Sequence, residues 1–321
     1  MSTLGLGGPL GELALSRATV DRVAERRADV AWVERAWADP ATRVLVISDS
    51  RALVDLSGEQ SALVFAAPPE APEGTRFLLG TDAGGVTYFG VSGDLAGGAP
   101  AREKSQVKPL QLRQVGADLS ARDAGLMTHA VALANWHDTH THCPRCGTPT
   151  VPAAAGHLTR CPKDGTEHFP RLDPAVIMLV IDARDRLLLA RNANWPPGRM
   201  SVLAGFVEPG ESCENAVARE VMEESSVRVD QVEYMGSQPW PMPRSLMLGF
   251  RALAGGEQEI KVDQDEIGEA RWFSRADLAA AIESGKIGVA PSSSIARRLI
   301  EYWYGGPLAN GGNSWARPPG R

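Results

Sequence analysis

The sequence predicts an α/β protein built from more than one folding unit, and three observations support this class. Short apolar runs of strand length alternate with stretches of helical periodicity over most of the chain. The length of 321 residues exceeds that of one typical small domain. Hydrophobic residues make up 43% of the chain and charged residues 22%, which is ordinary for a soluble globular protein.

The first 118 residues predict a small β-rich domain with one helix near 18–37. Apolar runs at 43–48, 62–67 and 86–91 have the length of strands, and Gly- and Pro-rich turn signals separate them. No residue pattern in this domain points to chemistry.

The rest of the chain predicts a helix, a cysteine-rich segment and then a mixed α/β domain. An amphipathic pattern at 118–138 predicts the first helix. The later elements expected are strands at 175–181, 186–191, up to Ala204, 227–237, 245–253 and 269–273, and helices at 214–225, 276–285 and 293–303. The predicted division is 1–118, 119–171, 172–303 and a Gly- and Pro-rich tail, 304–321, that is expected to be flexible.

Charge and hydropathy predict a cytoplasmic protein with no membrane segment. The longest apolar run, 175–181, has the length of a strand and is far shorter than a membrane span. The first residues lack the basic region and apolar core of a signal peptide. A net charge of −6 argues against broad electrostatic binding of nucleic acid.

Three glutamates on the predicted helix 214–225 indicate a metal site. Glu220, Glu223 and Glu224 are spaced i, i+3 and i+4, so their carboxylates lie on one face. Because like charges repel, a cation is expected to compensate them. Oxygen ligands favour Mg²⁺ or Mn²⁺, which also pair with phosphates. The stretch therefore predicts metal-assisted chemistry on a polyphosphate.

The residues around these glutamates resemble the Nudix box, G-x5-E-x7-R-E-U-x-E-E-x-G-U, where U is aliphatic. Gly205, Glu211 and the stretch 219–224 match it, and Val227 supplies the final aliphatic residue. One position departs, because Ser226 stands where the motif has Gly. Since that Gly often needs positive φ, a shifted helix end is one expectation. The resemblance implies a Nudix α/β/α sandwich, here preceded by a zinc-ribbon-like segment and the small β-rich domain.

The cysteine cluster supplies the first three positions of a zinc ribbon. Cys143, Cys146 and Cys161 follow C-x2-C…C spacing, and Asp164 occupies the fourth slot. Asp binds zinc in proteins, and four histidines lie nearby in sequence: His140, His142, His157 and His168. The alternative is a degenerate ribbon that folds without metal. A bound zinc would be structural, because a closed four-ligand site leaves no open position.

A second motif, SQPWPMPRS at 237–245, follows the box. Its three prolines predict a stiff loop that presents side chains to a ligand. A Nudix box followed by this motif resembles the NudC-type NADH pyrophosphatases, which also remove NAD caps from RNA; Met242 replaces the usual Phe. The resemblance covers about 110–302, including the cysteine cluster and the DEIGEARWF segment at 265–273.

The resemblance implies roles at matching positions. Glu220, Glu224, Glu266 and the backbone carbonyl of Ala204 would bind Mg²⁺ or Mn²⁺. The substrate pocket would be lined by Gln238, Pro239, Trp240, Pro241, Met242, Pro243, Arg244 and Ser245. Phe169 and Phe206 would contact the base or nicotinamide, Ala296 would lie against the ligand, and Arg113 matches a substrate-binding arginine loosely. The resemblance also implies a homodimer, with Phe169 reaching the partner subunit's ligand.

The implied reaction is cleavage of NADH to NMNH and AMP, and NAD-capped RNA would give NMN and 5′-monophosphate RNA. Glu223 or Glu224 would act as general base, and Arg219 would pair with Glu211 or a box glutamate. One alternative is a Nudix hydrolase of ADP-ribose or another nucleoside diphosphate derivative. A non-catalytic nucleotide sensor and a nucleic-acid-binding zinc ribbon are the others, which the complete set of box glutamates and the acidic charge disfavour.

Overall fold

The computed structural model describes residues 8–95 and 106–309. The chain forms two compact units. The N-terminal unit comprises 17–172 and 240–244, and the C-terminal unit comprises 1–16, 173–239 and 245–321. The boundaries predicted at 118, 171 and 303 stay predictions.

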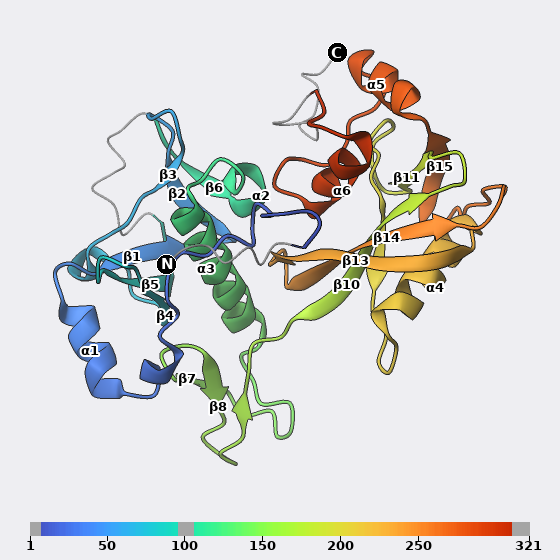
Figure 1. The fold of residues 1–321 in the computed structure, drawn as a ribbon. Coiled ribbons are helices and arrows are strands. Elements are labelled where there is room, and N and C mark those ends of the chain that lie inside the picture. Colours follow the sequence, from blue (N-terminus) through green and yellow to red (C-terminus); the bar gives the residue numbers. More distant parts are fainter. Residues whose placement is uncertain (1–7, 96–105, 310–321) are drawn as a thin grey trace. The chain divides into compact units, whose positions relative to one another are not determined.

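Two three-stranded sheets and a long helix form most of the N-terminal unit (Figure 1). One sheet has the order β1-β5-β4, with β1 parallel to β5, and the other has the order β3-β2-β6. Their strands are β1 Arg43–Ile47, β2 Arg51–Asp55, β3 Ala62–Leu63, β4 Thr75–Thr81, β5 Thr87–Ser92 and β6 Val107–Gln111. The helices are η1 Ala24–Arg26, α1 Val30–Ala38, η2 Pro68–Glu70, α2 Leu112–Val115 and α3 Ala121–Thr139. The predicted β-rich character of this region is confirmed.

Two predicted N-terminal elements are wrong in extent. The helix expected near 18–37 begins only at Val30, because the side chain of Asp29 caps it by accepting from the Trp32 amide. Upstream, Asp21 exchanges two backbone hydrogen bonds with Thr81, which keeps that segment extended. The strand expected at 62–67 is confined to Ala62–Leu63.

The C-terminal unit contains a six-stranded mixed sheet. The path is β13-β14-β10-β11-β15, with β12 paired to β10. The strands are β10 Asp173–Ile181, β11 Leu187–Asn192, β12 Leu203–Phe206, β13 Val229–Trp240, β14 Ser245–Ala254 and β15 Ile267–Phe273. β10 is parallel to β14 and antiparallel to β12.

Alternation along β10 divides the core of this unit into two layers. Val176, Met178 and Val180 belong to one apolar cluster with α4 (Cys213–Ser225). The intervening Ile177, Leu179 and Ile181 belong to a second cluster with α5 (Arg275–Glu283) and α6 (Ile295–Tyr304). Since successive strand side chains point to opposite faces, the helices cover both faces of the sheet. The predicted α/β/α sandwich is confirmed (Figure 1).

Residues 10–15 join this sandwich, and no pattern in the sequence indicates it. Leu10 and Leu13 are buried in the cluster that includes α5 and α6. The Leu15 amide donates to Gln238 Oε1 at 3.3 Å. The short stretch 10–15 shows neither helical nor strand periodicity, so its sequence does not predict which unit it packs against.

Residues 305–308, directly after α6, pack against the C-terminal unit. Gly305 ends the helix in the left-handed region, and Leu308 is buried. The Leu308 carbonyl accepts from Arg297 Nη2 at 2.7 Å. Residues 310–321, which make up most of the tail predicted to be flexible, lie outside the described residues.

Arg297→Met is expected to destabilise the C-terminal unit by about 3 kcal/mol. The substitution removes the buried guanidinium and leaves the Glu301 carboxylate and the Leu308 carbonyl without this donor. Arg297 is 1% exposed and pairs with Glu301, whose side chain is 13% exposed. Arg298→Met, at a side chain 45% exposed, is the control and should cost below about 1 kcal/mol. Thermal unfolding of both variants measures the difference. Equal shifts would contradict the prediction.

Among the described residues, none of the helices combines the length and the apolar character that crossing a membrane requires.

Candidate active site

The helix α4 carries the box glutamates and begins at a clear capping signal. Ser212 caps it, with its side-chain oxygen accepting from the Asn215 amide at 3.2 Å. The helix ends at Ser225, and Ser226 follows it with φ 59°. The shifted helix end is therefore not observed: Ser adopts the left-handed conformation that Gly would take, and its hydroxyl donates to the Lys261 carbonyl at 3.0 Å.

Arg219 holds the acidic side chains of the box in place. Its guanidinium donates to both oxygens of Glu211, at 2.9 and 2.8 Å, and to Glu220 Oε1 at 2.8 Å. It also donates to Glu223 Oε2 at 3.1 Å and to the Phe206 carbonyl at 2.9 Å. The predicted pairing is confirmed, and Arg219 binds several of its candidate partners at once. The hydrogen bonds from Arg219 lower the pKa of Glu211 to about 2.

Any side chain at position 205 would displace the Glu220 carboxylate, which lies against the backbone of Gly205. A Cβ built at this position would collide with the carboxyl carbon and both carboxyl oxygens of Glu220. Gly205 pairs with Val176 and Ala204 with Ile177 in the β10–β12 ladder. Strand β12 therefore places the backbone of Gly205, the residue after Ala204, against the Glu220 carboxylate.

Glu224 is the most unusual carboxylate of the site. It is buried, 8% exposed, and its Oε2 has no hydrogen-bond partner. Burial, together with the charges of Glu220, Glu266 and Glu223, raises the pKa of Glu224 to about 8. Burial, with the charges of Glu223 and Glu266 acting in the same direction, raises the pKa of Glu220 despite Arg219. Glu266, the residue directly before β15, acts through its charge on both Glu220 and Glu224 of α4.

These residues fit a divalent cation. A buried carboxylate oxygen without a donor is costly unless a cation neutralises it. The charges of Glu220 and Glu266 act on Glu224, and carboxylate oxygens are the hard ligands that Mg²⁺ and Mn²⁺ prefer. Arg219 leaves Glu224 unpaired, so its carboxylate is free to serve as a ligand.

The SQPWPMPRS segment forms the end of a hairpin. β13 continues through Trp240, β14 starts at Ser245, and the turn between them belongs to the N-terminal unit. In that unit Asn135 Nδ2 donates to the Pro241 carbonyl at 2.7 Å and to the Pro243 carbonyl at 3.3 Å. The predicted stiff loop is thus a turn between two strands, anchored by its own carbonyls.

Gln238 has a different environment from its neighbours in the motif. Its side chain is fully buried, Oε1 accepts from the Leu15 amide, and Nε2 donates to the Ser293 carbonyl at 3.0 Å. Both ends of the amide therefore bind protein groups. Pro239, Trp240, Met242, Arg244 and Ser245 are half-buried, Pro241 is buried and Pro243 is exposed.

The remaining predicted substrate residues are distributed over both units. Phe206, 59% exposed, belongs to the C-terminal unit, and Phe169, 63% exposed, to the N-terminal unit. Arg113 is exposed on α2 of the N-terminal unit. Ala296 is 2% exposed within the apolar cluster of α6, and its amide donates to Ser294 Oγ.

The cysteine cluster forms a compact site in two turns, one before β7 and one between β8 and β9, of the small sheet β7-β8-β9 (Val151–Ala153, Leu158–Arg160 and Glu167–His168). Cys143, Cys146, Cys161 and Asp164 each offer one ligand atom, and these four atoms all lie within 4.8 Å of one another. No histidine of the described residues joins this group. The hydrogen bond with the Thr148 side chain, followed by the one with its backbone, lowers the pKa of Cys146 to about 7. This chemistry fits zinc.

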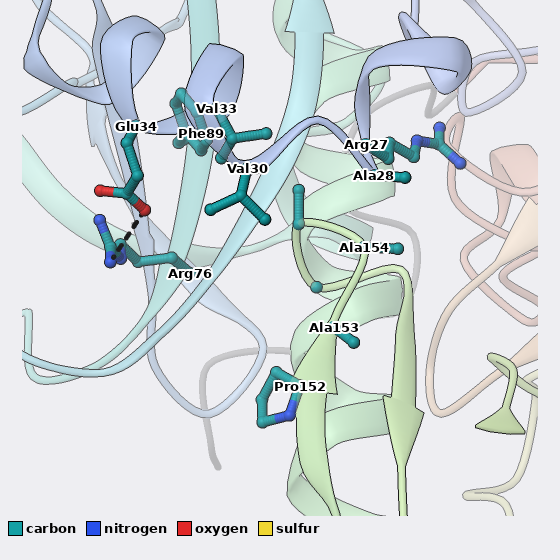
Figure 2. A pocket seen from close by; sticks show the side chains of 12 residues that line it. Arg27, Ala28, Val30, Val33, Glu34, Arg76, Phe89, Pro152, Ala153 and Ala154 are labelled. Carbon is teal, nitrogen blue, oxygen red and sulfur yellow. Dashed lines mark ion pairs between the residues drawn. The ribbon is translucent and has the colours of Figure 1, made fainter. Parts of the chain in front are cut away.

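The N-terminal unit also has a pocket that contains none of the predicted site residues (Figure 2). Val30, Val33, Phe89 and Pro152 contribute apolar surface, and Glu34 and Arg76 form an ion pair of 3.6 Å beside them. Its composition provides no ligand set for a metal or for a reaction.

The fold and the acidic site define a Nudix hydrolase, and comparison with known families agrees. The model of the NUDIX domain matches residues 171–291. The NADH pyrophosphatase zinc ribbon domain matches 138–169, and the NADH pyrophosphatase-like rudimentary NUDIX domain matches 41–136.

Full-length relatives narrow this class. The chain is 40% identical over 304 residues to proteins named NAD-capped RNA hydrolase NudC from Mycobacterium bovis and Mycobacterium tuberculosis, covering 90% of this chain and 94% of theirs. It is 33% identical over 335 residues to the human NAD-capped RNA hydrolase NUDT12, covering 90% of this chain and 72% of that one. The chain belongs to the NudC family of Nudix hydrolases.

Proposed function

We propose that this chain hydrolyses the pyrophosphate bond of NADH and NAD⁺ to NMN(H) and AMP, and that it removes NAD caps from RNA 5′ ends. The carboxylate cluster around the buried, unpartnered oxygen of Glu224 carries the chemistry. The choice of substrate is supported by likeness to relatives named NAD-capped RNA hydrolase over 90% of the chain.

We assign the site for Mg²⁺ or Mn²⁺ to Glu220, Glu224, Glu266 and the Ala204 carbonyl. A bound divalent ion neutralises phosphate charge and lowers the pKa of a coordinated water. Arg219 binds Glu220 and Glu211, and these hydrogen bonds restrain the two carboxylates. The reaction adds water to one phosphorus and breaks its bond to the bridging oxygen.

Glu223 and Glu224 are the candidates for the general base that removes the water's proton. Their environments differ, since the Glu223 side chain is 58% exposed and held by Arg219, whereas Glu224 is buried without a partner. We assign Glu224 to metal binding and Glu223 to removal of the proton from the attacking water. The substrate contacts that the resemblance implies stay proposals within each unit: Gln238, Pro239, Ser245, Phe206 and Ala296 in the C-terminal unit, and 240–244, Phe169 and Arg113 in the N-terminal unit.

We also propose a cytoplasmic homodimer. Phe169 and Leu172 are 63% and 59% exposed, and a second copy of the chain would cover this apolar surface. Light scattering on the purified protein measures the assembly directly.

A side-by-side turnover assay on NADH, NAD⁺, ADP-ribose and NAD-capped RNA tests the proposed substrate. We expect at least about a tenfold higher kcat/KM for an NAD-containing substrate than for ADP-ribose, because the family motif of 237–245 distinguishes the NADH-cleaving enzymes. The Glu224→Gln variant measures the background from contaminating phosphatases. A preference for ADP-ribose would instead establish the alternative, a Nudix hydrolase of another nucleoside diphosphate.

A further inference from the structure

The ribbon consists of two copies of one short motif, and its fourth ligand position differs between them. Residues 143–148 read CPRCGT, and residues 161–166 read CPKDGT. Cys146 in the first copy corresponds to Asp164 in the second. The remaining changes are confined to the third position, where Arg145 is replaced by Lys163.

The backbone of the second copy keeps the geometry of the first. In each copy the first cysteine's amide donates to a threonine carbonyl, and its own carbonyl accepts from a glycine amide, all at 2.9 Å. The bonds are Cys143 N to Thr148 O, Gly147 N to Cys143 O, Cys161 N to Thr166 O, and Gly165 N to Cys161 O. The two glycines have similar positive φ angles, 69° and 74°. The turn around Asp164 therefore has the same backbone geometry as the turn around Cys146.

The Cys146 sulfur contacts both a backbone amide and another cysteine sulfur. The Asp164 carboxylate makes the same two kinds of contact, one with each of its oxygens. Oδ1 accepts from the Thr166 amide at 2.9 Å, just as the Thr148 amide hydrogen-bonds to the Cys146 sulfur. Oδ2 lies 3.8 Å from Cys143 Sγ. Ligand atoms about 2.3 Å from a tetrahedral zinc are about 3.8 Å apart, so Oδ2 has the spacing of a ligand. Its partner oxygen is fixed by a backbone donor, as outer contacts fix metal ligands elsewhere.

Three of the four histidines near the ribbon are engaged elsewhere, and the fourth, His168, has a buried Nε2 without a hydrogen-bond partner but does not belong to the group of ligand atoms around the cysteines. His140 Nδ1 contacts the Thr139 hydroxyl at 2.9 Å, and His142 Nδ1 contacts the Thr141 hydroxyl at 2.8 Å. His157 Nε2 binds the Leu78 carbonyl at 2.7 Å. Among the described residues, Asp164 is thus the group that completes the set of three cysteines.

We propose that this ribbon holds zinc through three thiolates and Asp164 Oδ2, and that the ion exchanges through the side of the site that Asp164 forms. Cys143 and Cys161 are buried, whereas Asp164 is exposed. A carboxylate is also a harder ligand than a thiolate and suits zinc less well. The exposed oxygen ligand is therefore the weakest and most accessible point of the site. The proposal is independent of the pyrophosphatase activity, because it concerns metal content alone.

Zinc content and cobalt substitution of the full-length chain test this proposal. We expect about one zinc per chain in wild type purified with reductant, and loss of it in Asp164→Ala. Asp164→Cys should keep zinc against a chelator at least about tenfold longer than wild type. With Co²⁺, the thiolate charge-transfer band should rise by about one third in Asp164→Cys, because its intensity follows the number of thiolates. Glu167→Gln, which removes an exposed carboxylate of the same sheet, is the matched control and should behave as wild type.

Several results would overturn the proposal. Wild type that takes up neither zinc nor Co²⁺ has a degenerate ribbon without metal. Equal zinc retention in Asp164→Ala and wild type excludes Asp164 as a ligand. If Asp164→Ala does not fold, the Asp164→Cys protein decides: an unchanged charge-transfer band and an unchanged rate of zinc loss contradict the assignment.

Discussion

Glu224→Gln lowers kcat by on the order of a thousandfold while the fold remains intact, because it removes the charge of the buried ligand at the metal. The neutral amide keeps the size and shape of the side chain, so α4 and its packing are preserved. Turnover of NADH with Mg²⁺ and titration of Mn²⁺ binding measure the two effects. A variant that keeps a rate near that of wild type would refute the metal assignment.

The same substitution is expected to stabilise the metal-free protein at alkaline pH. The pKa of Glu224 is raised from 4.5 to about 8, chiefly by burial. Between these values the folded state holds more protons than the unfolded state, so stability is greatest below the unfolded pKa and falls as pH rises toward 8. In EDTA at pH 8 we expect Glu224→Gln to be more stable than wild type by roughly 3 kcal/mol, with the difference vanishing near pH 4.5.

Glu223→Gln is the matched control for the measurements of metal-free stability and of Mn²⁺ binding. Its side chain is 58% exposed, so neutralising it should change metal-free stability by below about 1 kcal/mol. If Glu223 acts on the water and Glu224 on the metal, Glu223→Gln loses turnover but keeps Mn²⁺ affinity. Equal loss of Mn²⁺ binding in both variants would show that the two roles are not divided in this way.

Gly205→Ala is expected to lower kcat/KM by about a hundredfold, although it adds a single methyl group. The new Cβ occupies the place of the Glu220 carboxylate, so that carboxylate must shift from the position in which Arg219 holds it. A displacement of about 1 Å at a catalytic group is enough for a loss of this size. Steady-state kinetics with NADH and Mn²⁺ titration measure it.

Gly306→Ala controls for the general effect of replacing glycine by alanine in the same unit. No atom lies within 4 Å of the Cβ that it would introduce, so activity and stability should stay close to wild type. If Gly205→Ala retains more than about half of the wild-type kcat/KM, the close packing of Glu220 on this strand has no catalytic consequence.

Local patterns predicted the elements that carry the chemistry with small errors at their ends. The helix expected at 214–225 is Cys213–Ser225, and the strands expected at 175–181 and 245–253 are Asp173–Ile181 and Ser245–Ala254. These segments have strong periodicity or long apolar runs, and Ser212 provides a side-chain cap. The helix expected at 18–37 begins later, at Val30, because the contact of Asp21 with Thr81 is remote in sequence and no local pattern indicates it.

The sequence by itself determined the acidic box, the order of its residues and the spacing of the ribbon ligands, because helix periodicity and short turns are local properties. Only the tertiary structure decided which carboxylate is left unpaired. Arg219 binds Glu211, Glu220 and Glu223, and the packing of α4 on the sheet buries Glu224 without a donor. Burial and unmet hydrogen bonds depend on neighbours from several segments, and these neighbours come together only when the chain folds.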